Sequence, residues 1–294
     1  MPAPRWLELL SFGVSAGGYV FMGLLLVGLI ATGWLVPGGG DVRDVYHSAG
    51  NALWTGQPVY TYNFPPYFYS PPFTVMLAVL SRLPLTLEWW LFNAANVAAI
   101  WYVAGSWRRV GYMLWIFPIA YELILGNVNL IVAAAIVAAV REGRTALPAA
   151  MTFAKFSPVL AVDPRQWRPF ALWILLGLAI TIPWWWLWPE WLGQMGRAWN
   201  DPVGPLVPIP FLVRLPVALV LVATRTRLGR AAGAVIAIPA LYFLSVVVLI
   251  APISIALDLL EERRVRRARA FPRPAHDLAP GRLTGAAEVA DIVG

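Results

Sequence analysis

The sequence predicts an all-α fold, a polytopic bundle of transmembrane helices. Hydrophobic residues make up 60% of the chain and charged residues only 13%, a composition that excludes an ordinary soluble domain. The mean hydropathy of +0.67 agrees with this. Residues 12–36 carry no charge, which is enough to cross a hydrocarbon core about 30 Å thick. We therefore expect an integral, multi-pass membrane protein.

Further uncharged runs mark the other expected membrane segments. Long runs cover residues 89–107, 123–140, 169–189 and 231–257, and shorter or interrupted runs cover 69–83, 112–121, 145–162 and 202–224. We expect about eight to ten membrane segments, some of them short or broken. The N-terminal run is too long for a cleaved signal peptide, and other segments follow it.

The net charge of +7 is unevenly placed along the chain. Arginines gather at positions 225–230 and again at 263–273, and the positive-inside rule predicts that both clusters are cytoplasmic. Because the second run directly follows a membrane segment, we do not expect nucleic-acid binding. Residues 1–270 are predicted to form a single domain. Residues 271–294, rich in Pro, Ala and Gly, are predicted to be a disordered cytoplasmic tail.

Two polar loops are expected on the extracytoplasmic side. They cover residues 38–68, after the first membrane segment, and residues 188–205. Between them the charge rule conflicts with itself, because Arg108, Arg109, Arg141 and Arg144 cannot all be cytoplasmic if every apolar run crosses fully. Half-helices or re-entrant segments lining a cavity would remove the conflict.

The first loop carries the residues that best fit catalysis. Asp41 and Asp44 lie three apart after three glycines, and Asp41 is placed to cap a short helix. A carboxylate near an acceptor hydroxyl can act as a general base. The alternative is that Asp41 only caps the helix and Asp44 faces water, paired with Arg43. Polar and aromatic side chains that could orient a carboxylate or bind a substrate surround the pair: Arg43, Tyr46, His47 and Tyr60.

Charges inside apolar segments are the second sign of a site. Glu122, Lys155 and Arg214 interrupt such segments, and Asn127 and Asn129 follow Glu122 closely. Each charge could instead snorkel to an interface or form a structural ion pair. Taken together with the acidic loop, they predict a polar cavity open to one face. A lysine or an arginine there suits a phosphate headgroup.

Several weak motifs follow one another in a fixed order over about residues 30–257. These are the loop DVRDVYHSAGNALWTGQPVY that begins at Asp41, FYSPPF with Pro71 and Pro72, RLP followed by Trp89 and Asn93, GNVN at 126–129, and KFSP at 155–158. In this order of motifs the chain resembles the polyprenol-phosphate-mannose-dependent mannosyltransferases of glycosyltransferase superfamily C. The chain departs from the family pattern where Asn127 replaces a glutamine, and VLIAPISIAL lacks an aromatic residue and a histidine.

The resemblance implies inverting transfer of a sugar, mannose, from a polyprenyl-phosphate donor to a lipid or glycan acceptor of the cell envelope. The enzyme would lie in the plasma (inner) membrane with an extracytoplasmic active site. Asp41 would be the general base and Asp44 the second choice for that role. Lys155 would lie near the donor phosphate, and Tyr46, His47, Asn127 and Asn129 would line the sugar site. No cofactor is implied, and the two aspartates leave a divalent metal open.

Two alternatives remain. A lipid or solute transporter, or a flippase, would also use broken helices and intramembrane charges, but its internal repeats are not evident in this sequence. A catalytically inactive accessory subunit would fit the departures from the family pattern.

Overall fold

The computed structural model describes residues 5–32, 40–60, 67–198, 211–238 and 243–270. Throughout these ranges every regular element is helical, which confirms the predicted all-α class. Contacts divide the chain into two units, Met1–Ile255 and Ala256–Gly294. The structure describes the second unit only as far as residue 270, within helix α13 (Ile250–Ala270). The predicted tail, 271–294, lies outside the described residues, and the predicted domain boundary stays a prediction.

Helix α1 (Arg5–Ala31) is long, apolar and largely exposed. Its main partner is α5 (Trp107–Met113), which it meets through two glycines. A Cβ on Gly18 would overlap the carbonyl group of Gly111, so only glycine permits this approach. The Ser15 hydroxyl donates to the Arg108 carbonyl oxygen at 2.9 Å. Arg108 therefore lies beside the N-terminal half of α1.

Helices α6 (Phe117–Leu125) and α7 (Asn129–Glu142) meet at a bend of 109°. The run 123–140, expected as one segment, is therefore two helices broken at Gly126, where φ is +72°. At the far end of α7, Arg141 Nη1 donates to the carbonyl oxygens of Tyr102 and Val103, at 3.2 and 3.3 Å, in the last turn of α4 (Leu85–Ala104). Arg141 therefore lies at the end of α4 that precedes Arg108 and Arg109 in the chain. The side of the membrane on which these arginines lie stays a prediction.

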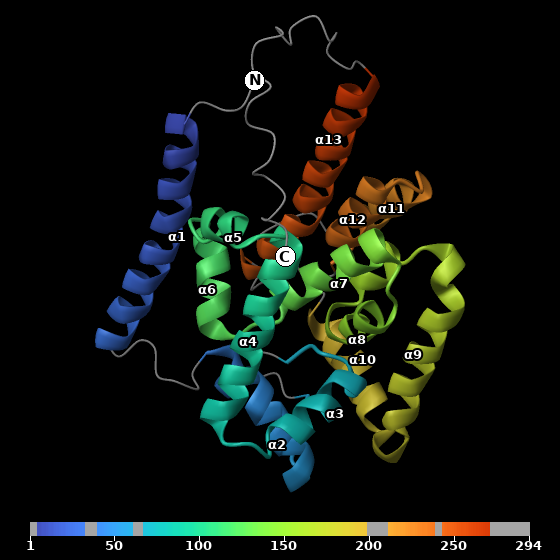
Figure 1. Cartoon of the computed structure of the whole chain (residues 1–294). Coiled ribbons are helices and arrows are strands. Elements are labelled where there is room, and N and C mark those ends of the chain that lie inside the picture. The colour runs from blue at the N-terminus through green and yellow to red at the C-terminus, as the bar shows by residue number, and fades with distance from the viewer. Residues whose placement is uncertain (1–4, 33–39, 61–66, 199–210, 239–242, 271–294) are drawn as a thin grey trace, which may run out of the picture. The chain divides into compact units, whose positions relative to one another are not determined.

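Helix α7 lies at the centre of several helix contacts. Among its neighbours are α4, α8 (Ala146–Lys155) and α12 (Arg227–Ile236) (Figure 1). Along α7 almost every apolar side chain is buried. Helices α9 (Trp167–Ile180) and α3 (Pro71–Leu80) lie against α8, and α11 (Phe211–Ala223) lies against α12. The expected segment 231–257 is also broken, because α12 ends at Ile236 and α13 begins at Ile250.

The two loops expected on one side of the membrane lie next to each other where the structure describes them. Helix α10 (Leu187–Ala198) includes part of the second loop. The Trp191 indole N–H donates to the carbonyl oxygen of Phe68, at 3.0 Å, at the end of the first loop. This contact agrees with a common location for the two loops and leaves the side of the membrane as a prediction.

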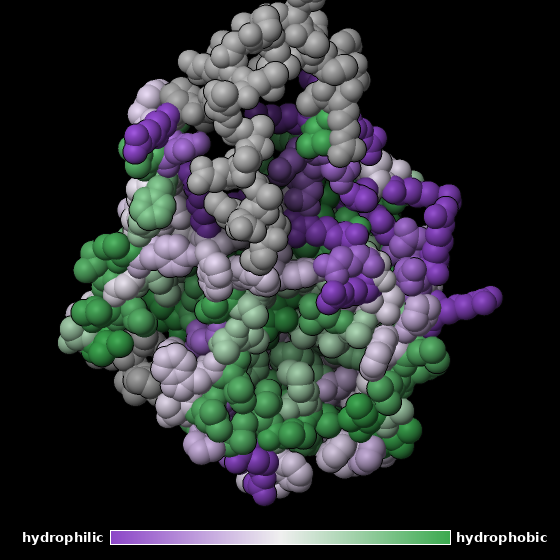
Figure 2. All heavy atoms as spheres, viewed as in Figure 1, coloured by the Kyte–Doolittle hydropathy of each residue, from purple (hydrophilic) through white to green (hydrophobic). Residues whose placement is uncertain are grey.

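Large apolar side chains are exposed on several helices. Figure 2 shows a wide area of hydrophobic residues over the lower half of the face drawn. Across the described residues, the exposed large apolar side chains of α1, α9 and α11 include Phe12, Leu24, Leu172, Leu212 and Val220. Among the described residues, α1 alone is long and apolar enough to cross a membrane, and a second crossing is counted if α6 and α7 form one broken span. The multi-pass arrangement therefore stays a prediction.

Candidate functional site

The candidate site lies at the break between α6 and α7. Two glycines with positive φ bring this break against the start of the first loop. A Cβ on Gly40, where φ is +66°, would lie 2.7 Å from a methyl carbon of Leu125. A Cβ on Gly126 would lie 2.6 Å from a methyl carbon of Val42. Because neither side chain would fit, the two glycines allow Asp41 and Asn127 to meet.

Asp41 is the carboxylate of this site. It precedes a π-helix, η1 (Val42–His47), which continues into α2 (Ser48–Thr55), and π-helical turns often occur at functional sites. The expected N-cap is wrong. Asp41 has helical dihedrals and its side chain makes no capping hydrogen bond. Its Oδ2 instead accepts from the Asn127 amide. Burial raises the pKa of Asp41, although the Asn127 hydrogen bond and the Lys155 charge oppose this.

Asn127 makes two hydrogen bonds in addition to the one with Asp41. Its Oδ1 accepts from the Val128 N–H at 2.7 Å, and its carbonyl oxygen accepts from the Asn96 amide at 2.6 Å. Asn96 is fully buried in α4. These bonds fix the amide that donates to Asp41, so the carboxylate is oriented by a rigid group.

Glu122 forms the second buried acidic position. Its Oε1 accepts the N–H of Asn129 at 2.7 Å and its Oε2 accepts from the Asn129 side chain at 3.2 Å. The carboxylate therefore lies at the N-terminus of α7, where the helix dipole stabilises negative charge. Buried Asn129 Oδ1 has no hydrogen-bond partner in the described structure. This leaves an acceptor that could bind a hydroxyl donor.

Lys155 brings a positive charge to these acidic groups. It is the last residue of α8, and its Nζ lies 5.8 Å from the centre of the Tyr69 ring. The charge of Lys155 acts on Asp41. The next residue, Phe156, has φ of +28°, an uncommon conformation for a residue with a side chain. Pro158 follows in a short 3₁₀ helix, so the chain turns sharply just after the ammonium group.

Four tyrosines form a cluster, and two of them, Tyr46 and Tyr69, lie near Asp41. The Tyr46 and Tyr69 hydroxyls lie 3.0 Å apart, and the two rings meet edge to face. The Tyr60 hydroxyl donates to the Tyr69 carbonyl oxygen at 2.9 Å and lies 3.1 Å from Thr74 Oγ1. Tyr67 also contacts Thr74 through its hydroxyl, at 2.8 Å. Tyr60 therefore holds Tyr69 in place, which differs from its expected role of orienting a carboxylate.

Asp44 and Arg43 lie apart from this arrangement. They form an exposed ion pair with each other, with Arg43 Nε 2.7 Å from Asp44 Oδ1. This matches the alternative interpretation of Asp44, and it makes Asp41 the stronger choice of the two aspartates. The guanidinium group of Arg43 is paired with exposed Asp44, so the geometry gives Arg43 no role at the Asp41 site.

His47 pairs with a residue that the sequence analysis missed. Its Nδ1 lies 2.6 Å from Oε2 of Glu88, which is fully buried at the start of α4. The sequence placed His47 in the sugar site, whereas among the described contacts it binds Glu88. Glu88 and Asn96 share one face of α4. Their polarity within an otherwise apolar helix was the available signal for both residues.

Arg214 is structural. It is buried in α11, and its Nη1 donates to the carbonyl oxygens of Ile236 and Ile238, at 2.7 and 2.9 Å. It satisfies carbonyl groups at the end of α12, whereas the sequence offered a polar cavity, snorkelling or an ion pair for this residue.

The site combines Asp41, Glu122, Lys155 and two asparagine amides. Among the described residues, no three His, Asp or Glu side chains lie close enough together to hold a metal ion. The chemistry on offer is proton acceptance by a carboxylate of raised pKa beside an ammonium group that can neutralise an anion.

Comparisons with protein-family models, with curated proteins and with solved structures find no match to this chain.

Proposed function

We propose that the chain is an integral membrane glycosyltransferase that moves a sugar, mannose, from a polyprenyl-phosphate donor to a lipid or glycan acceptor. The observation that carries the proposal is Asp41. Its carboxylate is largely buried, accepts a hydrogen bond from the Asn127 amide and interacts electrostatically with Lys155. Such a group can deprotonate an acceptor hydroxyl while a neighbouring cation offsets the charge of a departing phosphate.

The apolar surface supports a membrane location. Side chains such as Phe12, Leu172 and Leu212 are exposed, and contact of so much apolar surface with water would be unfavourable. Contiguous apolar exposure of this extent is typical of a surface that contacts lipid or another protein. A polyprenyl chain would reach the site from such a surface.

Lys155 supports a lipid-phosphate donor. A lysine ammonium is a compact charge that binds phosphate, and Lys155 also lies over the face of the Tyr69 ring. The polyprenyl phosphate departs with its bonding electron pair as the acceptor oxygen forms the new glycosidic bond. The acceptor proton passes to Asp41. Because inversion needs only one displacement, a single base is sufficient.

The test compares Asp41→Asn with Asp44→Asn in transfer from radiolabelled polyprenyl-phosphate-mannose. The two aspartates lie on one helical segment, and Asp44 is exposed, so the second variant controls for loss of charge in the loop. We expect Asp41→Asn to lower the transfer rate by about 10²- to 10⁴-fold and Asp44→Asn to retain it. Acidification should also lower the wild-type rate, because a base must be deprotonated to act.

Equal activity of Asp41→Asn and the wild type would exclude Asp41 as the base. Loss in Asp44→Asn alone would transfer the role to that residue. If neither the wild type nor any variant transfers sugar, while a known enzyme consumes the same donor, the proposed donor is wrong.

A further inference from the structure

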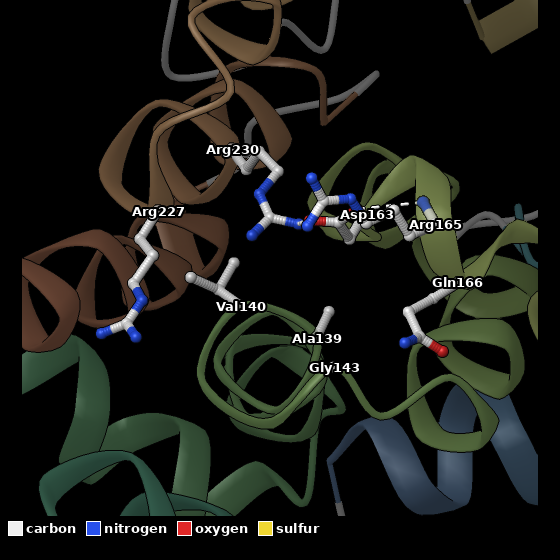
Figure 3. Close-up of a pocket in the computed structure, with 8 residues that line it drawn as sticks. All are labelled: Ala139, Val140, Gly143, Asp163, Arg165, Gln166, Arg227 and Arg230. Carbon is white, nitrogen blue, oxygen red and sulfur yellow. Dashed lines mark hydrogen bonds and ion pairs between the residues drawn. The ribbon is translucent and has the colours of Figure 1, made fainter.

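A cavity of about 300 Å³ opens beside the C-terminal end of α7. Figure 3 shows its floor, which is formed by Ala139, Val140 and Gly143. Polar side chains from two other segments surround it. Asp163, Arg165 and Gln166 precede α9, and Arg227 and Arg230 belong to the first turns of α12. The cavity lies at the opposite end of α7 from Asp41, about 20 Å along the helix axis.

The lining carries more positive than negative charge. Three guanidinium groups and one carboxylate line the cavity, a net of two positive charges. The carboxylate of Asp163 is already engaged on both oxygens. Its Oδ2 lies 3.1 Å from Arg230 Nη1, and its Oδ1 accepts the backbone N–H of Arg165 at 2.9 Å. In Figure 3 the side chains of Arg165 and Arg230 point toward each other, an arrangement that an anion between them would stabilise.

Arg230 keeps unused hydrogen-bonding capacity. It is only 8% exposed, and its Nε–H is buried with no acceptor in the described structure. A buried donor without an acceptor costs free energy, and more so on a charged group. The position adds to this cost, because Arg230 lies near the N-terminus of α12, where the helix dipole is also positive.

We propose that this cavity binds a phosphate group. Guanidinium groups match phosphate oxygens with paired, charge-assisted hydrogen bonds, and Gln166 offers an amide donor from the same wall. The cavity has room for a phosphate or pyrophosphate headgroup and too little for a whole lipid. The phosphate can belong to a lipid headgroup or to a soluble molecule. This site is separate from Asp41 and does not depend on the function proposed for it.

The experiment measures binding to the full chain in phosphatidylcholine nanodiscs. The soluble probes are radiolabelled inorganic phosphate and pyrophosphate, and the lipid probe is phosphatidic acid added to the nanodisc. Arg165→Gln is the main variant because Arg165 is exposed and its loss should not affect folding. Arg168→Gln is the matched control, since it is an exposed arginine three residues away that does not line the cavity.

We expect saturable binding of at least one probe and about tenfold weaker binding in Arg165→Gln, from loss of a charge-assisted hydrogen bond. Arg168→Gln should bind as the wild type does. Binding of the soluble probes would identify a soluble phosphate ligand, and binding of phosphatidic acid alone would identify a headgroup. The proposal is overturned if no probe binds saturably to the wild type. It is also overturned if Arg168→Gln weakens binding as much as Arg165→Gln, because the attraction would then be that of a basic surface.

Discussion

At one end of α7 the Glu122 carboxylate accepts the N–H of Asn129, close to Asp41 and Lys155. At the other end Arg141 donates to the carbonyl oxygens that end α4, and an arginine-lined cavity opens beside Gly143. Asp41 and Glu122 thus lie near the positive pole of the helix and Arg141 lies near its negative pole, the sides that the helix dipole favours. Each end also holds one opposite charge, Lys155 at the first end and Asp163 at the second.

The comparison shows that one buried helix, α7, separates the Asp41 site from the arginine-lined cavity. Between its ends α7 consists of alanine, valine and isoleucine, packed on all sides. Its length, about 20 Å, exceeds the separation of about 7–10 Å beyond which the effects of two substitutions without shared partners usually add. The acidic and basic ends can therefore be altered independently, and the predictions below test that independence.

Among the substitutions that test this comparison, Lys155→Ala should have the largest effect, on use of the donor. Removing the ammonium group should raise the donor KM by about ten- to a hundredfold, through loss of an ion pair with the phosphate, and should leave the acceptor KM nearly unchanged. Steady-state transfer with each substrate varied in turn measures both. Arg168→Ala, a surface charge change, is the control. An equal rise in both KM values would contradict a phosphate-specific role.

The next effect concerns Gly126, the glycine at the break between α6 and α7. Gly126→Ala should destabilise the chain more than Gly105→Ala, although φ is +72° at both positions. Each change introduces backbone strain of about 1–2 kcal/mol. A Cβ at Gly126 would also lie 2.6 Å from Val42, whereas nothing lies within 4 Å at Gly105, so Gly126→Ala should cost about 1–3 kcal/mol more.

Thermal unfolding in detergent gives the two values for comparison. The double variant Gly126→Ala with Val42→Ala should recover part of the loss, because the smaller side chain relieves the overlap. Equal destabilisation by Gly126→Ala and Gly105→Ala would show that the close approach to Val42 is unimportant.

A smaller effect is expected for His47→Ala, which tests the pair that His47 forms with Glu88 of α4. The change leaves the buried Glu88 carboxylate without its histidine partner and should lower stability by about 1–3 kcal/mol. Adding Glu88→Gln should restore part of this loss, since a neutral amide is easier to bury. A double variant less stable than His47→Ala would mean that Glu88 has another role.

The smallest effect is a pH dependence of stability through Asp41. Burial raises its pKa, so the folded chain binds the proton more tightly than the unfolded chain does. The contribution of Asp41 to stability is then present below its unfolded pKa and lost as the pH rises through the folded pKa. We expect the Tm of the wild type, relative to that of Asp41→Asn, to increase as the pH falls from 7 towards 5. A constant difference would contradict the raised pKa.

The sequence was sufficient for the all-α class and for the meeting of distant polar residues at one site. Glu122, Asn127, Asn129 and Lys155 stood out because polar groups in apolar segments need partners, and Asp41 stood out as a carboxylate in the loop after the first apolar run. Their mutual contacts required the positive φ of Gly40 and Gly126, which depends on packing against Leu125 and Val42. No periodicity in the sequence reveals such packing.

The contact made by the Asp41 side chain and the position of Tyr69 could not be predicted from the sequence, because both depend on packing. Asp41 resembles a helix cap by residue type, but the preceding Gly40 lets the helix begin earlier and frees the side chain. Tyr69 lies in an aromatic run where each tyrosine could equally face lipid. In the structure, hydrogen bonds from Ser70 to the carbonyl oxygen of Phe153 join the start of α3 to α8, and Lys155 lies over the face of the Tyr69 ring.

The break at Gly126 also bears on how the chain is made. On the proposed membrane placement, Glu122 and the two asparagines leave the ribosome before the lysine that shares their site. Until α8 is synthesised, those groups would face hydrocarbon with their partners incomplete, at considerable cost. The α6–α7 pair is therefore expected to stay in a protein-lined or aqueous setting during synthesis and to enter the bilayer only together with α8. The order of residues along the chain would then set the order of assembly.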